Sequence, residues 1–292
     1  MKKETVQRIF TVGSEWAYFK IYTGAYMADG LLVREIMPLA ARLMRESTVD
    51  CWFFIRYADP ERHLRVRFHL ADRDKLGYVI SSVYERLDRY VQDRSVQKIQ
   101  MDTYVREIER YGREHMECAE RLFCTDSRCV TGLLKVLPNE RMRSMAAFRL
   151  GDAILTAFGM DMMAKRDFTG ACAEAFKREF GFTGANAKVF NREYRVWQKP
   201  VRDAVECADA GMAEIDKVIE KHYRCGGTGR IVSELLSKRC NVTREEFLRS
   251  YLHMTMNRLF NSDNRRHEMV VYEYLHRYYK SAIARGASCE EG

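Results

Sequence analysis

Residues 63–70 read HLRVRFHL, and the stretch alternates polar and apolar side chains without a break. Because successive side chains of a β-strand point to opposite faces, this period of two predicts a strand. One face carries Leu64, Val66, Phe68 and Leu70, and the other carries His63, Arg65, Arg67 and His69. The cationic row has two interpretations: it is the solvated face of an antiparallel sheet, or it is a site that holds anionic groups.

The segments on either side predict a small sheet around this strand. Residues 51–57, CWFFIRY, form a nearly apolar strand that we expect to be central. A turn over 58–62, with Pro60, joins it to 63–70 as a hairpin. Composition and helical spacing predict two further strands over 16–22 and 96–104, and helices over 28–45 and 72–92.

The rest of the chain is predicted to be helical, with short breaks. The expected helices cover 104–122, 130–136 after a cap at Asp126 and Ser127, 142–163, 193–222 with a kink at Pro200, 243–259 after a cap at Thr243, and 269–284. Loops are expected at 181–191 and 225–229, and a disordered tail at 286–292. These features predict a single α+β domain over 1–292, in which a small, mainly antiparallel sheet in the N-terminal part packs against a mostly helical C-terminal part.

Composition narrows the classes of function. The 292 residues carry a formal net charge of +8 and 9 cysteines. The cysteines are scattered without a CxxC pair, so we expect reduced thiols and no zinc site. The sequence as a whole implies no cofactor or metal. The N-terminus lacks the apolar stretch of a signal peptide, and no apolar run reaches the length of a membrane span, so a cytoplasmic protein is expected. The basic charge permits an anionic partner, but no nucleic-acid-binding motif is present, and direct nucleic-acid binding is not predicted.

Three segments concentrate charged and polar residues: 54–68, 102–112 and 252–259. Glu107 and Arg110 are three residues apart on a predicted helix and therefore share a face. His253 and Asn257 are four apart beside an apolar stripe. Taken alone, the first pair fits a surface ion pair and His253 fits a structural histidine.

Taken together, the three segments resemble the C-terminal, glutamate-elimination domain of class I lanthipeptide dehydratases, which also occurs in thiopeptide-type bacteriocin biosynthesis proteins. The patterns that carry the resemblance are RYxDPxxHLRxRF at 56–68 and ExxRYG at 107–112, with LHMTMNRL at 252–259. The resemblance extends from WAYFKIY at 16–22 to the last helix and includes ERLF at 120–123.

The resemblance implies a lyase of ribosomal natural-product biosynthesis that removes glutamate from glutamylated Ser or Thr of a precursor peptide, leaving dehydroalanine or dehydrobutyrine. The glutamate would come from a separate tRNA-dependent glutamylation protein, because we expect this chain to be a stand-alone module. A homodimer is left open. The catalytic residues implied are His253, Arg67, Arg65, Arg110 and Glu107, and the residues expected to contact the substrate are Arg56, His63, Lys20 and Asn257.

General chemistry supports these roles. Fixed arginines bind carboxylates through paired charged hydrogen bonds and stabilise negative charge in a transition state. Histidine titrates near neutral pH and can act as a general acid or base. Two alternatives remain: a thiopeptide pyridine synthase that joins two dehydroalanines in a formal [4+2] cycloaddition, and a non-catalytic peptide-binding subunit of a split dehydratase. Arg258 is expected to be structural.

Overall fold

The structure, a computed structural model, describes residues 6–225 and 227–290, with side chains described as far as residue 286. The chain divides into two compact units, and each unit is formed by two separate segments of the sequence. Unit 1 comprises residues 1–135 and 233–262, and unit 2 comprises residues 136–232 and 263–292. Unit 1 contains strands and helices, whereas the described part of unit 2 is helical, so the predicted α+β class is confirmed. A single domain over 1–292 stays a prediction.

The main sheet of unit 1 is antiparallel and has four strands in the order β3-β4-β2-β5. The strands are β2 Trp16–Thr23, β3 Val49–Ala58, β4 Arg62–Leu70 and β5 Val96–Met101. The hairpin of β3 and β4 is confirmed by the pairing of Ala58 with Arg62. The expectation that β3 is central is wrong, because β4 is paired on both sides and β3 lies at an edge. The apolar character of β3 instead reflects cover by helices, since Trp52 and Phe54 are buried.

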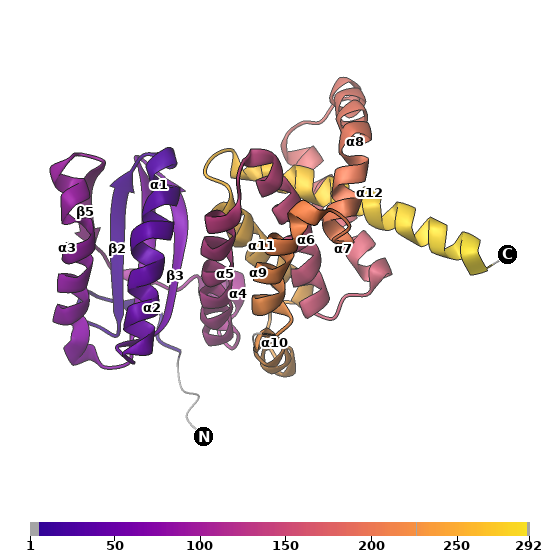
Figure 1. The fold of residues 1–292 in the computed structure, drawn as a ribbon. Helices are drawn as coiled ribbons and strands as arrows, with labels where there is room; N and C mark the ends of the chain where they lie inside the picture. The colour runs from indigo at the N-terminus through magenta and orange to yellow at the C-terminus, as the bar shows by residue number, and fades with distance from the viewer. Residues whose placement is uncertain (1–5, 226, 291–292) are drawn as a thin grey trace. The chain divides into compact units, whose positions relative to one another are not determined.

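Helices cover one face of this sheet (Figure 1). They are α1 Ala25–Leu31, a π-helical turn Leu32–Ile36, α2 Met37–Arg45 and α3 Leu76–Gln92, which follows a 3-10 turn over Arg73–Lys75. Their inward side chains, such as Leu39, Leu43 and Val83, are buried. The apolar row of β4 is buried as well, and Phe68 lies against Trp52 and Phe19 in the same core. The amphipathic pattern of these helices therefore places the core on the apolar side of β4.

The opposite face of the sheet meets a second, two-stranded sheet and the helices that follow it. This small sheet pairs β1 Ile9–Phe10 with β6 Tyr104–Val105. The helices are α4 Ile108–Tyr111, α5 Met116–Val136 and α11 Arg244–Leu259. The expected helix over 104–122 is therefore wrong at its start. The cap predicted at Asp126 and Ser127 is also wrong, because both residues lie buried inside the continuous helix α5.

Unit 2 is built from α6 Glu140–Ala157, α7 Met162–Glu179, α8 Gly184–Val205, a 3-10 turn Ala210–Met212, α9 Ala213–Tyr223 and α12 Asn264–Glu290. Helix α10 Thr228–Ser237 leads back to unit 1. The loop predicted over 181–191 is wrong, because Thr183 caps a helix that begins at Gly184. Pro200 lies inside α8. The predicted break at 225–229 includes Gly226, which is outside the described residues.

Two sequence expectations concern helix ends. The cap at Thr243 is confirmed, since its hydroxyl accepts from the backbone of Glu246 and the Glu246 carboxylate accepts from Thr243. In place of the disordered tail expected over 286–292, α12 continues to Glu290, and 291–292 lie outside the described residues. In the described part of the chain, every helix is too short or too polar to cross a membrane.

Candidate functional site

The cationic row of β4 lies against aromatic residues on both neighbouring strands. His63 is paired with Tyr22 and Tyr57, and Arg67 with Tyr18 and Phe53. Only 4% of the His63 surface and 7% of the Arg67 surface are exposed. The solvated-face interpretation is therefore wrong for these two residues. A buried guanidinium such as that of Arg67 is costly unless its charge is compensated, which favours the anion-binding interpretation.

Arg67 lies in a cage of aromatic rings. Its guanidinium carbon is 4.3 Å from the centroid of Tyr18, 4.7 Å from that of Tyr104 and 5.3 Å from that of Phe53. Ring faces offset part of the cost of removing a cation from water, but they do not neutralise its charge. Burial lowers the pKa of Arg67, and among the described residues its buried Nε has no hydrogen-bond partner. The cage therefore presents a charged donor that an anion can satisfy.

A small cleft of about 40 Å³ in unit 1 opens onto this cation. Arg67 lines it from β4 and Glu107 lines it from the start of α4. Most of the remaining wall is apolar or aromatic and comes from Phe53, Ile55, Tyr104, Val105, Tyr111, Met116, Phe123, Met254 and Arg258. Two arginines and one glutamate thus line a largely apolar recess, where charge–charge interactions are stronger than in water.

Glu107 and Arg110 form the ion pair that their spacing predicts. Nε of Arg110 lies 3.1 Å from Oε2 of Glu107, and both side chains are about half exposed. Arg110 itself does not line the cleft. Tyr111 follows Arg110 in sequence and is buried, and this burial raises the pKa of its hydroxyl. The hydroxyl donates a hydrogen bond to the backbone oxygen of Ser250 on α11.

Arg65 lies next to Arg67 on the same face of β4 and is held by two contacts. Its guanidinium carbon lies 3.4 Å from the ring centroid of Tyr57, and its Nε donates to Nε2 of His63 over 3.1 Å. Nδ1 of His63 is 2.8 Å from the backbone oxygen of Glu61, which fits a neutral ring with its proton on Nδ1. Burial lowers the pKa of His63 and favours that neutral form. His63 therefore orients Arg65 in this structure.

Lys20 lies directly opposite Arg65 on β2, so two like charges face each other across the sheet. Lys20 forms an ion pair with Asp102. The hydrogen bond to Asp102 raises the pKa of Lys20. Burial acts to raise the pKa of Asp102, but the hydrogen bonds from Lys20 and the Thr103 backbone, together with the charges of Lys20 and Arg65, lower it overall. The carboxylate of Asp102 thus lies near two cations, Lys20 and Arg65, and forms an ion pair with Lys20.

The edge of β3 is closed by side chains from α5 and α11. Asn257 accepts a hydrogen bond from the backbone N–H of Arg56 over 2.9 Å and donates to its backbone oxygen over 3.0 Å. Arg258 donates to the oxygen of Phe54 over 2.8 Å, and the hydroxyl of Ser127 accepts from the N–H of Phe54 over 3.2 Å. An edge strand would otherwise leave these backbone groups unpaired.

Two residues predicted to contact substrate have internal partners at this edge. Asn257 uses both ends of its amide on Arg56, and the guanidinium of Arg56 lies 2.5 Å from Asp29 and 3.0 Å from the backbone oxygen of Arg258. These contacts give both residues a positioning role in unit 1, and their expected contact with substrate stays a prediction. Arg258 is buried and lies 2.8 Å from Asp126, so its predicted structural role fits the contacts.

His253 lies on α11, one helical turn before Asn257, and is half-buried. Its neighbour in sequence, Met254, lines the cleft, whereas His253 does not. Of the five catalytic residues expected from the sequence, Arg67 and Glu107 line the cleft. Arg110 pairs with Glu107, Arg65 lies two residues before Arg67 on the same face of β4, and His253 lies on α11, which supplies Met254 and Arg258 to the wall.

Sequence reasoning missed the residues that hold the cage in place. The hydroxyl of Tyr104 donates to Oε1 of Glu120 over 2.8 Å, and Arg106 binds both oxygens of Glu120 over 2.7 and 2.6 Å. All three are buried, and burial raises the pKa of Tyr104. The network fixes the Tyr104 ring beside Arg67. All three residues lie in segments that carry the family resemblance, Tyr104 and Arg106 in 102–112 and Glu120 in 120–123. The sequence does not show that Arg106 binds Glu120, because residues 14 apart are brought together only by the fold.

Solved structures and curated proteins are similar to this chain. The tRNA-dependent lantibiotic dehydratase MibB from Microbispora sp. 107891 shares the fold over 94% of this chain and 29% of its own, with a TM-score of 0.73 and 22% identity. The pyridine synthase TbtD from thiomuracin biosynthesis shares the fold over 91% of this chain and 99% of its own, with a TM-score of 0.62 and 14% identity.

The curated relatives match in sequence over a shorter stretch. The nisin biosynthesis protein NisB of Lactococcus lactis subsp. lactis is 30% identical over 128 residues, and the subtilin biosynthesis protein SpaB of Bacillus subtilis is 31% identical over 123 residues. Each match covers 42% of this chain and 12% of the relative. The model of the family "Lantibiotic biosynthesis dehydratase C-term" matches residues 16–279. The chain therefore belongs to the lantibiotic biosynthesis dehydratase C-terminal family.

Proposed function

We propose that this chain eliminates glutamate from glutamylated Ser or Thr residues of a precursor peptide. In this reaction a base removes the α-proton, the electron pair forms the Cα–Cβ double bond, and the Cβ–O ester bond breaks. Glutamate leaves as a carboxylate, and dehydroalanine or dehydrobutyrine remains. The observation that carries the proposal is the caged Arg67 at a cleft, with a buried Nε that is unsatisfied among the described residues.

The proposed roles follow from the chemistry of each group. Arg67 and Arg65 bind the departing carboxylate and stabilise the charge that develops as the ester bond breaks. Glu107 orients Arg110, which binds the second carboxylate of the glutamyl group. His253 transfers the proton, since imidazole is effective near neutral pH. Lys20 adds positive charge on the same face of the sheet. The proposal requires no cofactor, and the glutamylated peptide would come from a separate tRNA-dependent protein.

The test is mass spectrometry of a glutamylated Ser/Thr peptide incubated with the purified chain. The expected result is loss of glutamate with formation of a dehydro residue, and no such loss with the His253→Ala variant. A folded wild-type protein that binds the peptide and leaves it unchanged would contradict the proposal. Folding of both proteins is checked by their circular dichroism.

A second candidate is the pyridine synthase reaction. The observation that favours it is the fold shared with TbtD, with a TM-score of 0.62 over 91% of this chain. A peptide bearing two dehydroalanines discriminates between the candidates. Conversion of this peptide, with no reaction of the glutamylated one, would favour cycloaddition. Binding of both peptides without any reaction would favour the peptide-binding subunit.

A further inference from the structure

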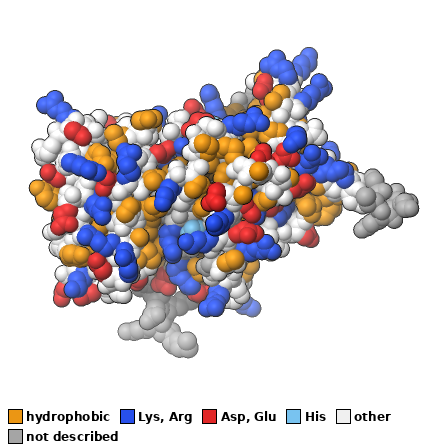
Figure 2. All heavy atoms as spheres, viewed as in Figure 1, with side chains coloured by type: hydrophobic (Ala, Val, Ile, Leu, Met, Phe, Trp, Pro, Cys, Tyr) orange, Lys and Arg blue, Asp and Glu red, His pale blue; other side chains and the backbone are white. Residues whose placement is uncertain are grey.

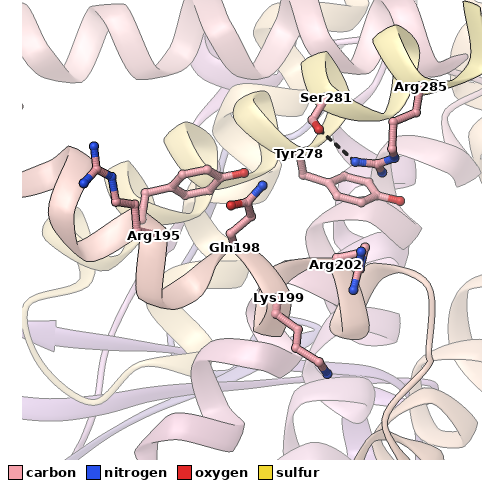
Figure 3. Close-up of a pocket in the computed structure, with 8 residues that line it drawn as sticks. Arg195, Gln198, Lys199, Arg202, Tyr278, Ser281 and Arg285 are labelled. Atoms are coloured by element: carbon pink, nitrogen blue, oxygen red, sulfur yellow. Dashed lines mark hydrogen bonds between the residues drawn. The ribbon is translucent and has the colours of Figure 1, made fainter. Parts of the chain in front are cut away.

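A second polar recess lies in unit 2, between helices α8 and α12, and the proposed elimination does not use it (Figure 3). Its volume is about 180 Å³. Its lining is made of Arg195, Gln198, Lys199, Arg202, Ser281 and Arg285, together with Tyr194 and Tyr278. Gln198 points toward α12, with Arg195 on one side of it and Arg202 and Arg285 on the other. The recess thus offers several hydrogen-bond donors around one space.

Three of its cations belong to a longer row along α8. Lys188, Arg192, Arg195, Lys199 and Arg202 follow one another at intervals of four, three, four and three residues, which puts them on one side of the helix. All five are exposed. At 1.5 Å per residue the row is about 21 Å long. Figure 2 shows Lys and Arg side chains gathered over α8. We call these five residues the α8 cation row.

The other side of α8 explains why the row faces outward. Phe190 and Tyr194 pack against the ring of Tyr274, and Trp197 packs against Phe148. Val201 is fully buried next to this stripe. Because these aromatic contacts fix the rotation of the helix, the cations are held toward solvent. Like charges at this spacing repel one another, so stability does not account for the row.

The negative charges near the recess balance only part of the positive charge. Lys199 pairs with Asp203, and Arg202 lies 3.9 Å from the same carboxylate. Arg285 lies 3.9 Å from Glu206 and donates to Ser281 over 2.8 Å. Within the described residues Arg195 makes no ion pair. The four cations that line the recess are thus balanced by two carboxylates, those of Asp203 and Glu206. The difference is two positive charges.

The chemistry of the neighbouring surface favours a peptide as the anion. Val189 and Val196, next to the α8 cation row on the helix, are 49% and 64% exposed. An extended peptide advances about 3.3 Å per residue, so about six residues match the row. Glutamate and aspartate side chains would pair with the guanidinium groups, and alternate apolar side chains would cover the valines. The sugar–phosphate backbone of a nucleic acid is polar and charged, and it has no apolar side chains that would cover the exposed valines.

We propose that the α8 cation row and its recess bind an acidic segment of the peptide substrate, outside the residues that react. This inference rests on the proposed function, because that function makes a peptide the substrate. Binding along α8 would hold the precursor by a segment that does not itself react. It gives unit 2 a role in substrate recognition that is separate from the chemistry.

The test measures binding without turnover. The probe is a fluorescently labelled short peptide in which glutamate alternates with apolar residues, and a peptide with glutamine in place of glutamate is the chemical control. The wild type is compared by anisotropy with Arg195→Gln/Arg202→Gln and with Lys217→Gln. Lys217 is an exposed cation of α9 and serves as the control for loss of one positive charge elsewhere in unit 2. Circular dichroism verifies that the variants are folded.

The expected result is a dissociation constant about tenfold higher for the double variant, because two guanidinium–carboxylate contacts are lost. Binding by Lys217→Gln should equal that of the wild type, and the glutamine peptide should bind weakly to all three proteins. Equal binding by the wild type and the double variant would overturn the inference. So would tight binding of an RNA oligonucleotide with no binding of the acidic peptide.

The outcome is distinguishable from failure of the proposed function. Elimination from a short glutamylated peptide without acidic residues should be unchanged in the double variant, since the α8 cation row lies outside the catalytic residues. Elimination without α8-dependent binding would overturn only the inference on α8. Binding without elimination would overturn the lyase and leave the peptide-binding role of α8 supported.

Discussion

Asn257 of α11 and Arg56 of β3 are joined by two hydrogen bonds, from the backbone N–H of Arg56 to the amide oxygen and from the amide nitrogen to the Arg56 carbonyl. A side chain here completes the pairing of an edge strand as another strand would. The contact ties the helix that carries His253 to the sheet that carries Arg65 and Arg67. Because His253 lies one helical turn before Asn257 on α11, the bonds of Asn257 to β3 also fix the position of His253 relative to the sheet.

The first prediction concerns this contact. Asn257→Ala leaves a buried N–H and C=O without their partners, and each such group costs about 1–3 kcal/mol. We expect the free energy of unfolding to fall by about 2 kcal/mol or more, measured by urea denaturation. Asn191→Ala, at an exposed site on α8, should change it by less than about 0.5 kcal/mol. Equal effects of the two substitutions would contradict the positioning role of Asn257.

The second prediction concerns the ion pair of Arg258 and Asp126, which is almost fully buried. Asp126→Ala leaves a buried guanidinium without its carboxylate, and such changes cost about 3–5 kcal/mol. Arg224→Ala breaks an exposed pair with Glu220 and should cost less than about 1 kcal/mol. Chemical denaturation of both variants checks the contrast. A mild effect of Asp126→Ala would mean that water or another group can replace the carboxylate.

The third prediction concerns Arg67 as the group that stabilises negative charge. Arg67→Gln should slow elimination about 10²–10³-fold, the usual effect of losing one such donor. Arg67→Lys keeps the charge but loses the planar pair of donors, so part of the loss should remain. The rates are measured by single-turnover mass spectrometry, with exposed Arg73→Gln as the control arginine. Wild-type rates for Arg67→Gln in a folded protein would remove Arg67 from the mechanism.

The fourth prediction concerns pH and His63. Because burial lowers the pKa of His63 from 6.5, the unfolded chain binds more protons than the folded one between the two pKa values. The contribution of neutral His63 to stability is therefore complete above pH 6.5 and is lost as the pH falls toward the lowered pKa. Protonation at Nε2 also removes the acceptor for Arg65.

The measurement is the urea midpoint as a function of pH, for the wild type and for His63→Gln. As the pH falls from about 7 to about 5, the urea midpoint of the wild type should decrease more than that of the variant. If both proteins show the same pH dependence over this range, burial of a neutral His63 is not the source of the effect.

The sequence was most informative where its pattern repeats over a whole element. The alternation at 63–70 predicts β4, and the apolar spacing over 72–92 predicts α3. The cap at Thr243 was predictable because its bonds are formed by residues three apart in sequence. By contrast, the same kind of residue at Asp126 looked like a cap and is instead the buried partner of Arg258, 132 residues later. Local patterns do not report such distant partners.

The candidate site shows the same division. The sequence alone determined the strand with its cationic row and the pairing of Glu107 with Arg110, because these depend on a period of two and on neighbouring turns of chain. Only the tertiary structure decided that Arg67 lies in an aromatic cage and that Arg65 leans on His63. It also decided that β3 is an edge closed by α5 and α11. These features arise from burial and from contacts between distant segments, and the periodicity of a single element carries no information about them.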